Sequence, residues 1–205
     1  MTTKIITFIV VGFIVLLITL VYLRSQANKQ GRLVEKQDAR KACRVMGRKI
    51  KRIALFRRWT VLKGVSLRTK KRTAFIDFLI IAPFGLLALS VRGEKGQIYA
   101  GPNDAKWLHV NGPNKDYIPN LIDQNRAIQE DLRWVLSTEK IYKVPIYTLA
   151  VFTERKLELY FPINEGDVLL KSRLRKELKK SKYRAELPIA SDRILDAVEK
   201  YRYKS

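Results

Sequence analysis

The chain has 205 residues, with 41 Lys or Arg against 19 Asp or Glu, and its formal net charge is +22 at pH 7. This charge favours a polyanionic partner, a membrane surface or a nucleic acid, over a small neutral substrate. The only cysteine, Cys43, excludes an internal disulfide and fits a reducing compartment. The length fits one ordinary domain with an appendage.

Residues 5–23 carry no charged side chain and are about as long as a helix that crosses a bilayer. The stretch lacks the small-residue cleavage site of a signal peptide, so we predict an uncleaved transmembrane helix. From Arg24 to Arg72, Lys and Arg greatly outnumber the two acidic residues, Glu35 and Asp38. The positive-inside rule therefore predicts a single-pass protein of the cell inner (plasma) membrane with a cytoplasmic C-terminal domain.

Residues 24–56 read as a basic juxtamembrane helix, because apolar residues recur at helical spacing opposite Lys and Arg. Cations next to a membrane span attract anionic lipid headgroups, although they could equally bind nucleic-acid phosphates. Both partners stay open at this point, as does a role limited to fixing the membrane topology.

The central stretch, residues 74–101, predicts two buried strands joined by a turn at Pro83-Phe84-Gly85. Phe75 to Ala82 is apolar except for Asp77. A carboxylate in such a strand is costly unless it is paired, protonated or bound to a metal. Asp77 is therefore a candidate metal ligand, or a structural carboxylate satisfied by an Arg or by main-chain N–H groups.

The rest of the chain predicts further helices and strands. A helix is expected over 120–136 with Asn120 near its N-cap, followed by strands over 146–152 and 157–161. Residues 164–205 are expected to form a basic C-terminal helical region, with an amphipathic helix over 168–186 and a short helix over 191–203.

Several short motifs occur in one order along residues 57–163: Ile76-Asp77, Phe84-Gly85, Gly96 to Gly101, Trp107, and Asn120 to Asn125. In this order they resemble the NERD family, nuclease-related domains that share the restriction-endonuclease-like core. The resemblance implies an α/β fold with a mixed central sheet flanked by helices, here after an N-terminal transmembrane helix.

The family's Glu-x-Lys motif is replaced. Counting back from Gly96, its positions fall on Ser90 and Arg92. In such nucleases carboxylates hold Mg²⁺ or Mn²⁺, and the Lys orients water or stabilises charge. The resemblance places Gln124 close to the same cleft and makes Glu35, on the first helix, a second possible metal ligand. With Ser90 and Arg92 in place, we expect a degenerate catalytic site; an enzyme using Asp77 and Glu35 with Mg²⁺ or Mn²⁺ stays the alternative.

A basic cluster precedes Asp77 in the sequence, in a predicted loop: Arg68, Lys70, Lys71 and Arg72. Beside a nuclease-like cleft such a loop is suited to contact the phosphates of DNA or RNA. The sequence thus predicts a membrane-anchored nuclease-related protein that binds DNA or RNA. A non-enzymatic scaffold that binds anionic lipid stays the third hypothesis.

Overall fold

The computed structural model describes residues 2–69, 72–101, 103–160, 167–188 and 190–203, except for the side chains of 2–13, 24 and 26–36. The chain divides into two compact units, Met1–Asp38 and Ala39–Ser205. The second unit holds every strand that the structure describes. It includes residues 39–56 and 164–205, which the sequence placed outside the nuclease-related domain.

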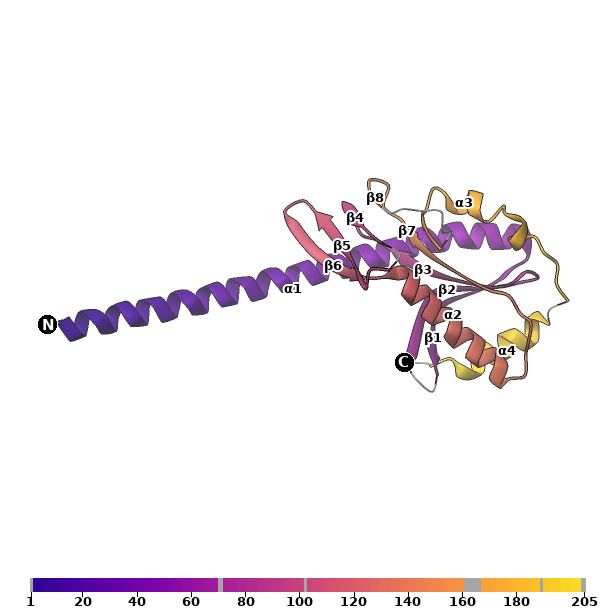
Figure 1. Cartoon of the computed structure of the whole chain (residues 1–205), viewed down its shortest axis with the longest axis horizontal. Helices are drawn as coiled ribbons and strands as arrows, with labels where there is room; N and C mark the ends of the chain where they lie inside the picture. The colour runs from indigo at the N-terminus through magenta and orange to yellow at the C-terminus, as the bar shows by residue number, and fades with distance from the viewer. Residues whose placement is uncertain (1, 70–71, 102, 161–166, 189, 204–205) are drawn as a thin grey trace. The chain divides into compact units, whose positions relative to one another are not determined.

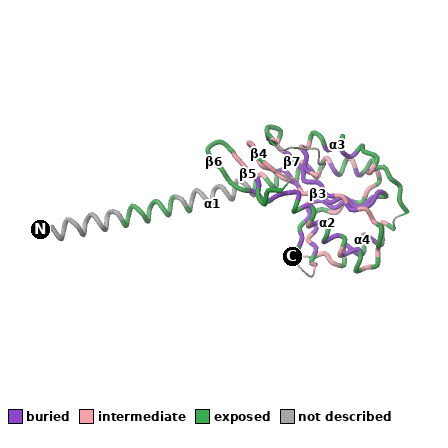
Figure 2. Tube along the Cα trace, viewed as in Figure 1, coloured by how far each residue is buried: buried purple, intermediate pink, exposed green. Residues whose placement is uncertain are grey.

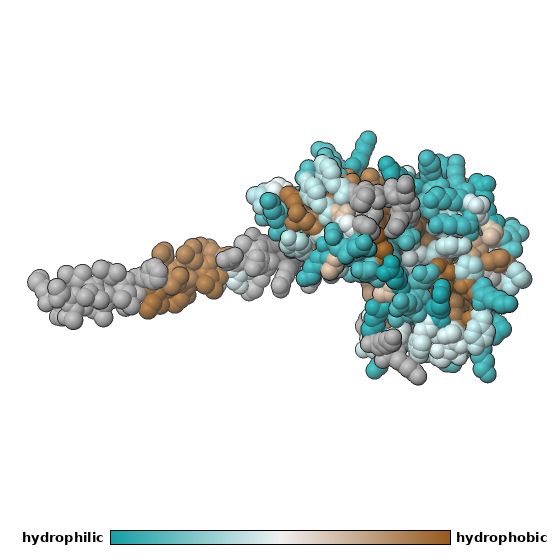
Figure 3. All heavy atoms as spheres, in the orientation of Figure 1, coloured by the Kyte–Doolittle hydropathy of each residue, from teal (hydrophilic) through white to brown (hydrophobic). Residues whose placement is uncertain are grey.

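Helix α1 has the bounds Thr2–Arg57 (Figure 1). Its side chains from Ile14 to Leu23 are exposed and mostly apolar, and they form the brown segment in Figure 3. Across the part of the chain that is described, no helix is long and apolar enough to cross a membrane. The predicted span, 5–23, begins with residues whose side chains lie outside that part.

The central sheet has five strands in the order β1-β2-β3-β7-β9. Strands β1 (Thr60–Arg68), β2 (Thr73–Ala82) and β3 (Gly85–Arg92) are antiparallel neighbours. Strands β7 (Ile146–Phe152) and β9 (Val168–Leu170) add to β3 in parallel. The sheet is therefore mixed, as the sequence predicted.

Helices cover both faces of this sheet. On one face, Ala42, Met46 and Ile50 of α1 share a core with Leu174 of α3 (Leu174–Glu177) and with Tyr183 of the 3-10 turn η1 (Ser181–Tyr183). On the other, α2 (Leu121–Thr138) and α4 (Ser191–Tyr201) pack on alternate residues of the same strands. Figure 2 shows the buried residues gathered on the strands between these layers. Alternation of side chains along a strand explains how apolar strands serve two cores.

A second, smaller sheet has the order β6-β5-β4-β8. It consists of β4 (Gln97–Tyr99), β5 (Lys106–Asn111), β6 (Asn114–Pro119) and β8 (Glu158–Tyr160). Ile98, Trp107 and Ile118 point into a third core with the start of α2 and with β7. Strands β5 and β6 are antiparallel neighbours and form a hairpin.

The region from Val168 to Glu186 is not the amphipathic helix that the sequence predicts. Val168–Leu170 forms the edge strand β9 on β7, and α3 is a single turn. Leu174 and Leu178 are buried, so the apolar spacing reflects core contacts rather than a long helix. Pairing with a distant strand overrides local helix propensity here.

Candidate functional site

Asp77 lies on β2 where this strand stops pairing with β3, since their ladder ends at Phe78 and Leu89. Its Oδ2 accepts a hydrogen bond from the Val91 main-chain N–H at 2.7 Å. Its Oδ1 accepts one from the thiol of Cys43 on α1, with Sγ 3.3 Å away. Both oxygens of the candidate metal ligand thus have partners within the fold.

The contact with Asp77 also changes the pKa of the Cys43 thiol. Burial raises the pKa of the Cys43 thiol to about 12, and the negative charge of Asp77 and the hydrogen bond to it add to this effect. Lys63 opposes the shift. The pair therefore consists of a neutral thiol that donates and a carboxylate that accepts.

The two substituted motif positions lie on β3. Ser90 is half-buried and pairs in register with Ala150 of β7. Nη2 of Arg92 lies 2.6 Å from Oε1 of Glu94, whose side chain is only 10 % exposed. The main-chain carbonyl of Arg92 accepts from the N–H and hydroxyl of Thr153. The cation at the position of the family's Lys is thus held by a carboxylate.

Glu94 was not among the predicted site residues. Glu94 lies two residues after Arg92, and residues two apart on an extended chain share a face. This spacing could have indicated that the two side chains meet. Glu94 Oε2 and Arg92 Nε are buried and have no hydrogen-bond partner among the residues that the structure describes.

The donor set at this site does not fit a divalent cation. Mg²⁺ prefers several oxygen ligands in octahedral geometry, and carboxylates supply the charge. The site offers Asp77, with both oxygens in use, a neutral Ser90 hydroxyl and a cationic Arg92. Among the described residues no three His, Cys, Asp or Glu side chains gather in a way that could hold a metal. The side chain of Glu35 lies outside this set.

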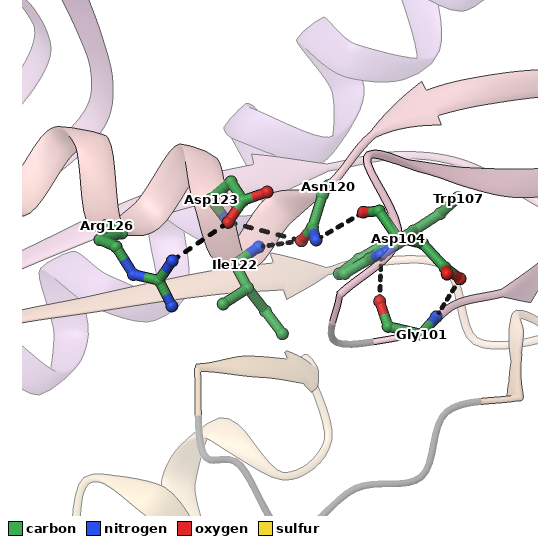
Figure 4. Close-up of polar contacts among 7 residues, drawn as sticks. All are labelled: Gly101, Asp104, Trp107, Asn120, Ile122, Asp123 and Arg126. Carbon is green, nitrogen blue, oxygen red and sulfur yellow. Dashed lines mark hydrogen bonds and ion pairs between the residues drawn. The ribbon is translucent and has the colours of Figure 1, made fainter.

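Asn120 fixes the start of α2, as Figure 4 shows. Its Oδ1 accepts from the main-chain N–H groups of Ile122 and Asp123, and its Nδ2 donates to the carbonyl of Asp104. Asp104 in turn accepts from the Gly101 N–H, and the Trp107 indole donates to the Gly101 carbonyl. The motif residues that carry the family resemblance here join the second sheet to α2.

Gln124 is exposed, and its main-chain N–H makes an ordinary helical bond to Asn120. Its neighbour Asn125 is the buried residue, and the Asn125 amide donates to the carbonyl of Asp167, next to β9. The resemblance placed Gln124 close to the cleft, and the residue that the structure buries is its neighbour Asn125.

The basic cluster before β2 is partly neutralised. Arg72 pairs with the buried carboxylate of Asp131 on α2 through Nε and Nη2, each 2.8 Å from Oδ2. The Thr69 hydroxyl lies 3.4 Å from the other oxygen. Arg68, at the end of β1, is exposed. Lys70 and Lys71 lie outside the described residues.

Comparison with known proteins gives one family. The family model described as NERD, nuclease-related domain, matches residues 38–153, more than half of the chain. A search of curated proteins and a search of solved structures return no match. The match starts within α1, so the family's domain includes the helix that carries Cys43. The chain belongs to the NERD family of nuclease-related domains.

Proposed function

We propose that this chain is a membrane-anchored NERD protein that binds DNA or RNA and does not hydrolyse it. One observation carries the proposal: both oxygens of Asp77 accept hydrogen bonds from the fold itself, one from Val91 and one from Cys43. In an active nuclease of this kind these oxygens would be metal ligands.

The neighbouring substitutions support the same conclusion. A Ser hydroxyl is a weak neutral ligand, and an Arg side chain stays protonated, so neither Ser90 nor Arg92 can replace a carboxylate or act as a base. The carboxylate of Glu94 is engaged in an ion pair with Arg92. Hydrolysis needs a metal that this donor set is poorly suited to hold.

Binding of nucleic acid is supported by family membership and by charge. A chain that contains a nuclease-related domain and has a net charge of +22 retains the electrostatic means to hold a phosphate backbone. We assign the phosphate contacts to the loop between β1 and β2, with Arg68, Lys70 and Lys71 as direct contacts. Arg72 is tied to Asp131 and anchors the base of this loop.

Membrane anchoring is supported by residues 5–23. The described part of this stretch, Ile14 to Leu23, exposes apolar side chains that the fold of its own unit does not bury. Exposed apolar surface of this extent marks a contact with lipid or protein. The excess of Lys and Arg after Arg24 supports a plasma-membrane location with residues 24–205 in the cytoplasm.

The binding half of the proposal is tested with the full-length protein in detergent and labelled single- and double-stranded DNA and RNA. Replacing Arg68, Lys70 and Lys71 with Glu is expected to weaken binding and flatten its salt dependence. The matched control replaces three exposed cations elsewhere, Lys106, Lys115 and Arg133, and should change binding much less. Equal loss in both variants would contradict the assigned loop, and no binding by the parent protein would contradict the proposed function.

A further inference from the structure

A second basic surface lies on the opposite side of the molecule's central sheet from α2 and α4, over α1 and α3. It is made of exposed cations from the two neighbouring segments, and we refer to it as the α1–α3 basic face: Arg44, Arg48, Lys51, Arg52, Arg173, Arg175, Lys176 and Lys179.

Direct contacts hold the two segments together. Nζ of Lys49 on α1 donates to the carbonyl of Lys171 at 2.7 Å. Arg57, at the end of α1, donates to the carbonyl of Leu178 at 3.0 Å. Both segments also contribute to one apolar core. Cations that are distant in sequence are therefore presented by one fixed surface.

None of the eight cations forms an ion pair with a carboxylate among the described residues. Residues 39–58 contain no acidic residue, and residues 171–184 contain only Glu177. Glu177 is buried, and Lys180 and Lys182 form ion pairs with it. Burial lowers the pKa of Lys49, and repulsion from Lys171 and Arg175 lowers it further. Such repulsion is relieved when an anionic surface covers the face.

Two apolar residues interrupt the cations at the end of α1. Leu55 is 72 % exposed and Phe56 is 88 % exposed. Their neighbours Ile50 and Ala54 point into the core, so Leu55 and Phe56 lie on the outward side of the helix. Arg52, Arg57 and Arg58 flank them in the sequence. Apolar side chains surrounded by cations are typical of segments that rest in the headgroup region of an anionic bilayer.

We infer that the α1–α3 basic face docks on a bilayer containing anionic phospholipid, with Leu55 and Phe56 inserted below the headgroups. A nucleic-acid backbone would satisfy the cations but would gain nothing from Leu55. An anionic bilayer binds the cations through its headgroups and also takes up the apolar side chains of Leu55 and Phe56. We therefore favour the bilayer over a nucleic acid as the partner of this face. The inference does not depend on the proposed binding of nucleic acid, which uses the loop between β1 and β2.

The test uses full-length protein in which Phe56 is replaced by Cys and labelled with an environment-sensitive dye, in a Cys43→Ser background. The Ser hydroxyl can still donate to Asp77. The protein is incorporated into vesicles of phosphatidylcholine alone or mixed with phosphatidylserine, with brominated acyl chains as quenchers. Tyr142→Cys provides the control position, since Tyr142 is 66 % exposed and adjoins Ile141, which packs in the core on the other face of the sheet.

Charge is tested in the same system with two sets of four substitutions to Glu. The first set lies on the α1–α3 basic face: Arg48, Arg52, Lys176 and Lys179. The matched set has the same change in net charge and lies elsewhere on exposed positions: Lys106, Lys115, Arg133 and Arg155. Circular dichroism checks that both variants fold.

We expect the dye at position 56 to be quenched only in vesicles that contain phosphatidylserine, with no quenching at position 142. The first set of substitutions should lower the docked fraction by at least about tenfold, and the matched set should leave it nearly unchanged. A dye at position 56 that stays in water in both kinds of vesicle would overturn the inference. It would also be overturned if DNA or RNA, rather than lipid, shielded the dye and the first set abolished that shielding.

Discussion

The Asp77 carboxylate occupies the place of a main-chain acceptor in the central sheet, because its Oδ2 accepts the Val91 N–H at 2.7 Å just where β3 stops pairing with β2. The carboxylate thereby continues the hydrogen bonding of the sheet beyond its ladder. Asp77 has a structural role in this arrangement, whatever role the same position has in an active nuclease.

This role predicts a stability loss when the acceptor is removed. Asp77→Ala leaves the Val91 N–H without a partner and should lower the free energy of unfolding by about 1–3 kcal/mol. Asp77→Asn keeps an amide oxygen for Val91 and should cost less. Urea unfolding followed by circular dichroism measures both. Equal stability of the wild type and Asp77→Ala would contradict the structural role.

The thiol of Cys43 should be unusually unreactive. Because its pKa is raised from 9.0 to about 12, the thiolate is scarce at neutral pH and alkylation by iodoacetamide should be slow. Asp77→Asn removes the negative charge and should lower this pKa and speed alkylation. The rate of alkylation against pH, measured in both proteins, tests the effect. A Cys43 that reacts like a free thiol would contradict it.

The raised pKa of the Cys43 thiol also predicts that the stability of the fold depends on pH. The folded-state pKa is raised, so the contribution of Cys43 is fully present below about pH 9 and is lost as pH rises towards about 12. Cys43→Ser lacks this titration. The free energy of unfolding of the wild type should therefore fall more steeply than that of Cys43→Ser over this range, as measured by urea unfolding at several pH values.

Gly64 and Gly85 should differ sharply in the stability that is lost when each is replaced by Ala. Gly85, in the β2–β3 turn, has φ +121°, and an added Cβ would lie 2.3 Å from the carbonyl oxygen of Pro145. Gly64 has φ +59°, and an added Cβ would meet no atom within 4 Å. Gly64→Ala should cost about 1 kcal/mol from backbone strain alone, and Gly85→Ala should cost clearly more. Comparable unfolding midpoints for the two variants would contradict the close packing at Pro145.

The ion pair at the base of the basic loop gives a further prediction. Asp131→Asn removes the partner charge of Arg72, which is 45 % exposed, and should destabilise the fold by about 1 kcal/mol. It also frees a cation beside Arg68, so nucleic acid should bind more tightly and with a steeper salt dependence. Fluorescence anisotropy at several salt concentrations measures this. Weaker binding despite an intact fold would contradict the placing of phosphate near this loop.

Much of the fold follows from sequence pattern. The apolar runs around Pro83-Phe84-Gly85 predicted β2 and β3, and Asn120 predicted the start of α2, because these features depend on neighbouring residues alone. Residues 168–186 were misjudged because β9 is defined by its pairing with β7, in which Val168 lies opposite Ala150, and the local pattern does not show this contact.

For the candidate site, the sequence predicted which residue types are present but not which side chains contact one another. The sequence identified Asp77 and the replacement of the family's Glu and Lys by Ser90 and Arg92. It could not show that Cys43 on α1 and Val91 on β3 would occupy the two oxygens of Asp77, since that depends on how a helix packs on the sheet. The ion pair between Arg92 and Glu94 was likewise missed, although residues two apart on an extended chain share a face.

The central claim is that this NERD domain holds nucleic acid without cutting it. The most direct measurement incubates the full-length protein with labelled single- and double-stranded DNA and RNA in Mg²⁺ or Mn²⁺, beside Asp77→Asn. We predict salt-sensitive binding and intact substrates for both proteins. Metal-dependent cleavage by the wild type that is lost in Asp77→Asn would contradict the account and show that Asp77 still serves as a metal ligand.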